Sequence, residues 1–127
     1  MADVNRGNRP LSPHLSIYRP QITSISSILT RITGNALVVA GLLIVWWFLA
    51  ASSGPEHFAI ADGFLRSWFG DLVLSLSVLG LWYHTLAGLR HLVWDNAMML
   101  ELELAEKLGW GCIAGSVVLT VITLLIV

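Results

Sequence analysis

The sequence predicts an all-α membrane protein with three transmembrane helices that form part of a multi-subunit helical bundle. Only 15 of the 127 residues are charged, 12%, about half of the ~25% that is typical of a soluble domain. These charges leave three long uncharged segments, each close to the ~20 residues that a helix needs to cross a membrane. Three helices enclose little interior, so any polar group buried among them is expected to be shared with partner subunits.

The uncharged segments define the expected helices. They run over 32–55, 72–89 and 108–127, which are 24, 18 and 20 residues. Their apolar residues are continuous and do not alternate, which favours helices over the strands of a barrel. We predict a single membrane-anchor domain, 1–127, with spans at about 30–52, 70–93 and 107–127. Residues 1–29 are expected to form a cytoplasmic arm that leads into the first helix.

Charge and cysteine content exclude other classes of protein. The net charge is −1 and there is one cysteine, Cys112. Without a basic patch the chain is not expected to bind nucleic acid. One cysteine cannot form an internal disulfide or a cysteine-based metal site. The partners that remain are membrane lipid and other protein subunits.

Arginine and lysine predict the orientation, because they gather on the cytoplasmic side of membrane proteins. The segment that ends with the start of the first helix contains Arg6, Arg9, Arg19 and Arg31. The first loop has only Arg66, whereas Arg90 and Lys107 flank the second. We therefore expect a multi-pass protein of the bacterial inner membrane, with a cytoplasmic N-terminus and a periplasmic C-terminus. Tryptophans at the predicted membrane boundaries agree, with Trp82 as the exception.

Two histidines mark a first candidate site in the second predicted helix. His84 and His91 are seven residues apart, so they share a helix face about 10.5 Å apart along the axis. Small residues accompany them: Ser77, Gly80, Ala87 and Gly88. Such a groove could receive a flat macrocycle whose iron His84 ligates. The structural alternative is that the small residues let another helix approach and that His84 is a hydrogen-bonded packing residue.

The second axial ligand of such an iron is expected from another chain. Two histidines on one helix face cannot reach both sides of one iron, and His14 and His57 lie outside the predicted helices. His91, beside Arg90 and Asp95, is equally consistent with a plain interfacial residue.

A second candidate site leads into the first predicted helix. Ser27 and Arg31 are four residues apart and therefore neighbours on a helix face. A hydroxyl and a cation there can bind a carbonyl, a quinone oxygen or a haem propionate. The alternative is that the serine caps the helix and that the arginine reaches lipid headgroups. Upstream, the proline-broken segment 9–20 is suited to docking on a soluble partner.

These motifs resemble those of the cytochrome b556 membrane anchors of succinate dehydrogenase, in respiratory complex II. The first motif is Arg9-Pro10-Leu11-Ser12-Pro13-His14-Leu15, followed by Ser27-Ile28-Leu29-Thr30-Arg31-Ile32-Thr33-Gly34. The second is His84-x-x-x-Gly88-x-Arg90-His91-x-x-Trp94-Asp95. The resemblance covers the whole chain. It departs from the family at Thr30, where the family usually has a histidine near the haem propionates and the quinone pocket.

The resemblance implies a role for each matching residue. His84 matches the axial ligand of haem b, whose other ligand comes from the smaller anchor subunit. Ser27 and Arg31 match quinone-binding positions, and Arg31 also lies close to a haem propionate. His91 falls in the haem environment, and Asp95 matches an acidic position in proton supply.

The resemblance also implies the partners. In the family, succinate is oxidised at FAD in a flavoprotein subunit, and iron–sulfur clusters in a second soluble subunit carry the electrons to ubiquinone at the anchors. The chain would thus be a non-flavin subunit of an enzyme complex. Three alternatives stay open at this point: a fumarate reductase anchor, a purely structural anchor without a redox role, and a small transport subunit that moves protons through His84 and Asp95.

Overall fold

The computed structural model describes residues 17–127, and four helices make up most of that range. They are α1 (Ile22–Ser53), α2 (Pro55–Leu65), α3 (Trp68–Asp95) and α4 (Leu102–Ile126). Three of them, α1, α3 and α4, are long and apolar enough to cross a membrane. No strand occurs within residues 17–127. The predicted fold class, an all-α membrane protein with three spans, is therefore confirmed.

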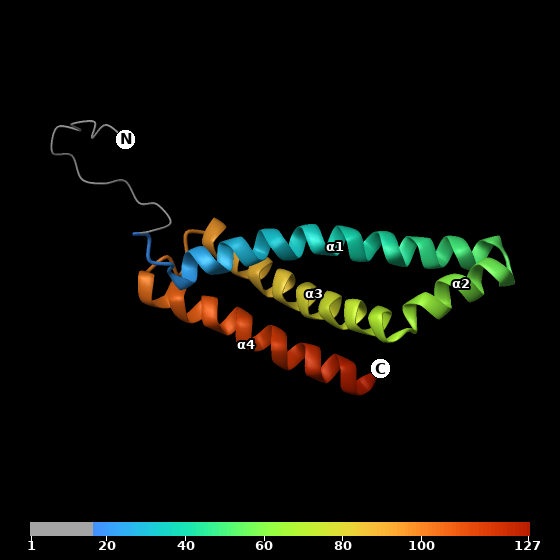
Figure 1. Ribbon diagram of the computed structural model, residues 1–127. Helices are drawn as coiled ribbons and strands as arrows, with labels where there is room; N and C mark the ends of the chain where they lie inside the picture. The colour runs from blue at the N-terminus through green and yellow to red at the C-terminus, as the bar shows by residue number, and fades with distance from the viewer. Residues whose placement is uncertain (1–16) are drawn as a thin grey trace, which may run out of the picture.

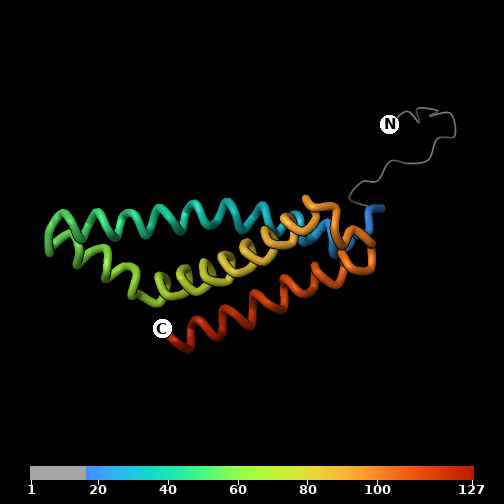
Figure 2. Tube along the Cα trace, turned by 180° about the vertical axis from the view of Figure 1, so that it is seen from behind, coloured from blue at the N-terminus to red at the C-terminus, as the bar shows by residue number. Residues whose placement is uncertain are grey.

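The three long helices lie side by side, with α3 antiparallel to both α1 and α4 (Figure 1). Seen from behind, the short α2 joins α1 to α3 at one end, and residue 17 and the C-terminus lie toward opposite ends (Figure 2). We call the end that holds 17–34 and 83–109 the polar end. The end that holds 46–70 is the aromatic end.

Helix α1 begins at Ile22, earlier than the span expected from hydropathy. Gln21 and Ser24 form a capping box that satisfies backbone groups of the first turn. The helix has 32 residues, so it is about 48 Å long and exceeds the ~30 Å hydrocarbon core. The serine- and threonine-rich segment 22–31 is thus helical, and it places its polar side chains at the polar end of the bundle.

Helix α2 lies where the sequence predicts only a loop. Gly54 precedes it with φ 125°, a left-handed conformation that suits glycine, and Pro55 follows in the first turn. The α2–α3 junction is tight, because a β-carbon at Gly70 would overlap the carbonyl oxygen of Leu65. His57 is part of this helix and exposed, so its expected position outside any helix was wrong.

The buried centre of the bundle lies between α3 and α4. Tyr83 and Ala87 of α3 pack against Cys112 of α4. Ala87 therefore faces α4, and its expected place in a groove beside His84 was wrong. Trp82, which did not fit the pattern of boundary tryptophans, donates its ring N–H to the Thr123 hydroxyl at 2.9 Å. That hydrogen bond satisfies the indole in the apolar part of the bundle.

Candidate functional site

His84 of α3 is held against the start of α1 by its Nδ1 atom. This nitrogen lies 3.2 Å from the Thr30 carbonyl oxygen and 3.2 Å from the Thr33 hydroxyl. A carbonyl oxygen can only accept, so Nδ1 carries the proton of the neutral ring. The Thr33 hydroxyl gives its own proton to the Leu29 carbonyl at 2.8 Å, which leaves it free to accept as well. The other ring nitrogen, Nε2, then has an unprotonated lone pair, as a metal ligand requires.

Gly34 of α1 makes room for the His84 ring. A β-carbon at Gly34 would lie 3.1 Å from Cε1 of the ring. One turn along α3, Gly80 lines a groove of about 340 Å³ between α1 and α3, together with Ser77, Ala36, Leu37 and Ala40. Ser77 and Gly80, two of the four small residues predicted to accompany the histidines, therefore line a groove together with small residues of α1. His84, Ala87 and Gly88 are not among the residues that line it, so a groove that contains His84 stays a prediction.

His91 is held differently from His84. Its Nδ1–H donates to the Ala87 carbonyl of its own helix at 2.8 Å, and its ring tilts against Trp94 with centroids 5.4 Å apart. The side chain is exposed. No other helix fixes it in residues 17–127, so His84 is the better oriented of the two histidines.

Ser27 and Arg31 lie where the sequence placed them, on successive turns near the start of α1. Ser27 is half-buried and Arg31 is exposed. Neither side chain forms a hydrogen bond or ion pair with the rest of residues 17–127. Both therefore keep their polar groups available to a ligand. Thr30, between them, contributes through its backbone, because its carbonyl accepts the His84 proton.

Ser26, the neighbour of Ser27, is a buried residue that sequence reasoning missed. Its carbonyl accepts a hydrogen bond from the Tyr83 hydroxyl at 2.9 Å, and its own hydroxyl accepts one from Arg90 Nη1 at 3.1 Å. Ser26 has no exposed surface and Arg90 is only 4% exposed. The signal in the sequence was Arg90 itself, because a charged residue inside an apolar helix usually marks function and must find a polar partner. That partner is Ser26.

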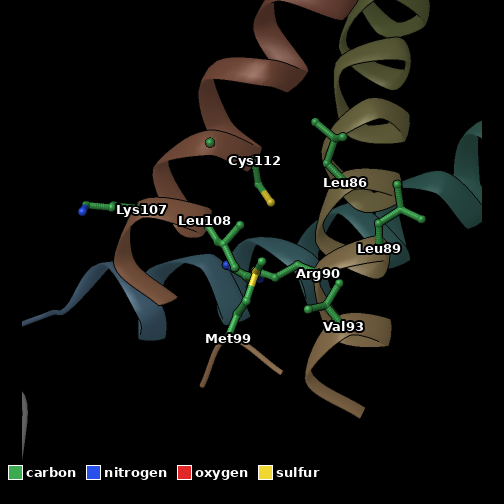
Figure 3. A pocket seen from close by; sticks show the side chains of 9 residues that line it. Leu86, Leu89, Arg90, Val93, Met99, Lys107, Leu108 and Cys112 are labelled. Atoms are coloured by element: carbon green, nitrogen blue, oxygen red, sulfur yellow. The ribbon is translucent and has the colours of Figure 1, made fainter. Parts of the chain in front are cut away.

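Arg90 also borders a pocket of about 310 Å³ between α3 and α4. Figure 3 shows its side chain reaching from α3 toward α4, whereas Lys107 points away from the pocket. Lys107 is instead paired with Glu103 at 2.6 Å. The pocket wall is mostly apolar, with Leu86, Leu89 and Leu108 among its residues. Of the two charged residues that line this pocket, Arg90 is therefore the one whose side chain points into it.

Asp95 is the last residue of α3 and is exposed. A carboxylate there faces the negative end of the helix dipole, which is unfavourable. It forms no ion pair in the part of the chain that the structure describes. The cationic arm residues Arg6 and Arg9, and His14 with its prolines, lie outside the described residues.

Within residues 17–127, the donor set at the polar end fits haem better than it fits a free metal ion. No group of three or more histidine, cysteine, aspartate or glutamate side chains could hold a metal ion within residues 17–127. A haem needs only axial ligands from the protein, because the macrocycle supplies the other four donors. One oriented imidazole with an open Nε2 meets that requirement on one side of the iron.

Comparison with known proteins gives the family. Residues 5–123 match the family described as "Succinate dehydrogenase/Fumarate reductase transmembrane subunit". The chain is 57% identical to the succinate dehydrogenase cytochrome b556 subunit of Paracoccus denitrificans, over 99% of this chain and 97% of that protein. It is 38% identical to the cytochrome b556 subunit of Rickettsia conorii, over 90% and 89%. It is 41% identical to the cytochrome b560 subunit of Marchantia polymorpha, over 76% and 74%. The chain therefore belongs to the family of succinate dehydrogenase and fumarate reductase transmembrane subunits.

Proposed function

We propose that this chain anchors succinate dehydrogenase in the membrane, binds haem b together with a second small anchor subunit, and forms part of the ubiquinone-reduction site. The observation that carries the proposal is the hydrogen bond that fixes the His84 ring and its tautomer. Its Nδ1–H is held by the Thr30 carbonyl, so Nε2 is available to the iron. The cytochrome names of the relatives support a haem. When bound, haem supplies a one-electron redox centre near the quinone.

Ser27 and Arg31 form the quinone side of the proposed site. Reduction of ubiquinone places negative charge on its oxygens, and a guanidinium near one of them stabilises that charge. The Arg31 side chain is exposed and is free to make this contact or to reach a haem propionate. Ser27 donates a hydrogen bond to a quinone oxygen and relays a proton to it.

His91 and Asp95 extend the proposed site toward the membrane surface. His91, whose Nδ1–H donates to the Ala87 carbonyl and whose side chain is exposed, belongs to the haem environment. Asp95 has an exposed carboxylate at the end of α3, where it can take protons from water and pass them toward the quinone. A carboxylate at the negative end of the α3 dipole lowers stability, so a function for Asp95 would explain why an acidic residue occupies this position.

The proposed orientation places the polar end at the cytoplasmic side of the bacterial inner membrane. Arg19, Arg31, Arg90 and Lys107 lie at this end, whereas Arg66 is the corresponding cation near the aromatic end. The N-terminus is then cytoplasmic and the C-terminus periplasmic. The polar end would face the iron–sulfur subunit, with the flavoprotein subunit beyond it.

The haem part of the proposal is tested on the purified complex that contains this chain. A reduced-minus-oxidised spectrum is expected to show a b-type band. A complex with full succinate oxidation and no such band would contradict haem binding and favour a purely structural anchor. Proton flux through the chain without its partner subunits would instead favour a transport function.

The quinone part is tested with Ser27→Ala and Arg31→Gln. Both variants are expected to slow succinate-driven ubiquinone reduction, while succinate oxidation with an artificial acceptor stays intact. Ser52→Ala and Arg66→Gln are matched controls, because both residues are exposed and lie at the aromatic end. Equal loss of both activities in the Ser27 and Arg31 variants would show a structural role and contradict the proposed site.

A further inference from the structure

Arg90 is a buried cation, and no carboxylate of residues 17–127 forms an ion pair with it. It is 4% exposed, and both ion pairs in residues 17–127 lie elsewhere. A buried charge is costly, and an apolar residue of similar size usually packs helices as well or better. Packing α3 against its neighbours therefore does not explain why an arginine occupies this position.

The guanidinium of Arg90 is fixed from three directions. Its central carbon lies 4.5 Å from the centre of the Trp94 ring, and Nη1 donates to the Ser26 hydroxyl of α1 at 3.1 Å. On the α4 side, Gly109 makes room: a β-carbon there would lie 3.6 Å from Nη1 and 3.3 Å from Ile22. The charge is thus held between α3, α4 and the first turn of α1.

Tyr83 adds a second contact to the same residue of α1. Its hydroxyl donates to the Ser26 carbonyl at 2.9 Å, and the tyrosine is 5% exposed. Ser26 is therefore hydrogen-bonded through both its side chain, to Arg90, and its backbone carbonyl, to Tyr83. Because Ser26 directly precedes Ser27 on a rigid helix, these two contacts fix the rotation of the first turns of α1 about the helix axis.

We propose that Arg90 is a positioning residue, which with Tyr83 clamps Ser26 and so sets the direction in which Ser27 and Arg31 face the quinone. The inference rests on the proposed quinone site and adds to it the residues that orient it. Arg90 contacts Ser26 and not the quinone, so losing it is expected to weaken quinone binding more than turnover.

The test measures quinone KM and kcat separately in the assembled complex. Arg90→Gln is expected to raise the KM for quinone about tenfold, the size expected for loss of one hydrogen bond to a charged group. Tyr83→Phe removes a neutral hydrogen bond and is expected to raise KM roughly threefold. In both variants kcat, the haem band and the artificial-acceptor activity stay near wild type, and Arg90→Lys restores part of the loss. Arg66→Gln, at the other end of the bundle, is the control.

A double-mutant cycle separates the clamp from unrelated effects. Ser26→Ala removes the acceptor of Arg90, so the double variant Ser26→Ala with Arg90→Gln is expected to be no worse than Arg90→Gln alone. If Arg90→Gln fails to assemble, Ser26→Ala and Tyr83→Phe carry the test, because each removes one contact without changing a charge.

Three results would overturn the clamp: fully additive effects in the cycle, an unchanged quinone KM in Tyr83→Phe and Ser26→Ala, or an equal rise in the Arg66→Gln control. These outcomes differ from failure of the proposed function. That failure would appear as unchanged quinone reduction in Ser27→Ala and Arg31→Gln, whatever the Arg90 variants do.

Discussion

The two ends of the bundle hold α1 against its neighbours by different chemistry. At the polar end, Ser26, Tyr83 and Arg90 form buried hydrogen bonds, and the Arg90 charge pairs with no carboxylate of the described residues 17–127. At the aromatic end, Asp62 accepts the Trp47 ring N–H at 3.2 Å and pairs with Arg66, whose side chain is 80% exposed. The aromatic end joins α1 and α2 with contacts that stabilise at low electrostatic cost. The polar end contains a buried charge and buried polar groups, whose desolvation costs free energy. Their presence despite this cost indicates that function selected them.

Edge-to-face aromatic pairs connect the helices at the aromatic end. Trp47 meets Phe58 of α2 at 5.4 Å, and Trp46 meets Phe64 at 5.8 Å. Phe64 in turn meets Phe69 of α3 at 6.1 Å. Such pairs add about 0.5–1.5 kcal/mol each beyond the area they bury. Changes here should therefore affect stability and leave the chemistry of the polar end intact.

The largest expected effect on stability is at the α2–α3 junction. Gly70→Ala would place a β-carbon against the Leu65 carbonyl, and such overpacking is expected to destabilise by about 3 kcal/mol. Thermal unfolding of the solubilised complex measures the loss. Gly63→Ala is the control, because nothing lies within 4 Å of a β-carbon there. A Gly70→Ala complex that also lost quinone affinity would break the separation between the two ends.

The next largest effect is expected beside His84. Gly34→Val would push against Cε1 of the ring, and a cost of about 2 kcal/mol corresponds to a roughly 30-fold loss of haem affinity. The measurement is haem content after purification. Gly41→Val carries the same substitution at a position of α1 with nothing within 4 Å. Equal haem content in the two variants would show that the His84 ring is not part of the haem site.

A smaller effect is expected from Trp47→Phe at the aromatic end. The variant removes the hydrogen bond to Asp62, so the complex is expected to lose about 1 kcal/mol of stability. Quinone KM and the haem band are expected to stay at their wild-type values. A change in either would mean that the aromatic end also sets the geometry of the site.

The smallest effect on stability is expected at Asp95, with the opposite sign. Asp95→Asn removes a charge from the unfavourable end of the α3 dipole, which should stabilise by about 0.3–1 kcal/mol. The same variant is expected to slow quinone reduction, because the carboxylate no longer supplies protons. Unfolding midpoint and quinone reductase rate are measured on one preparation. A variant that is stabilised and fully active would remove Asp95 from the proposed site.

Much of the fold could be predicted from the sequence, because scarce charge in a short chain leaves few alternatives to membrane helices. The exception is α2. Its segment 53–67 contains Gly54-Pro55, which suggests a loop, but the spacing of Phe58, Ala61 and Leu65 is helical. Two of these three, Ala61 and Leu65, are buried. This short apolar face packs α2 against its neighbours. It spans too few residues to be recognised as a helical pattern in a sequence that is apolar almost throughout.

The candidate site was predictable by residue type and less so by orientation. His84 contacts Thr30 and Thr33 of α1, the same helix that carries Ser27 and Arg31, and a shared site for the three residues stays a prediction. Ser26 was missed because adjacent serines differ only in helix phase, and phase depends on how α1 packs against α3. The hydrogen bond from His84 to the Thr30 carbonyl was also invisible, because a backbone acceptor leaves no signature in residue identity.

The proposed function depends most on His84 as the ligand that this chain gives to haem. The direct measurement is the visible spectrum of His84→Ala in the purified complex, before and after carbon monoxide, with His57→Ala as the control because His57 is exposed on α2. We predict that His84→Ala either loses haem or retains a haem that binds carbon monoxide at the freed position, whereas His57→Ala keeps the wild-type spectrum. A His84→Ala complex with a band of unchanged position and height, and no response to carbon monoxide, would contradict haem ligation by His84.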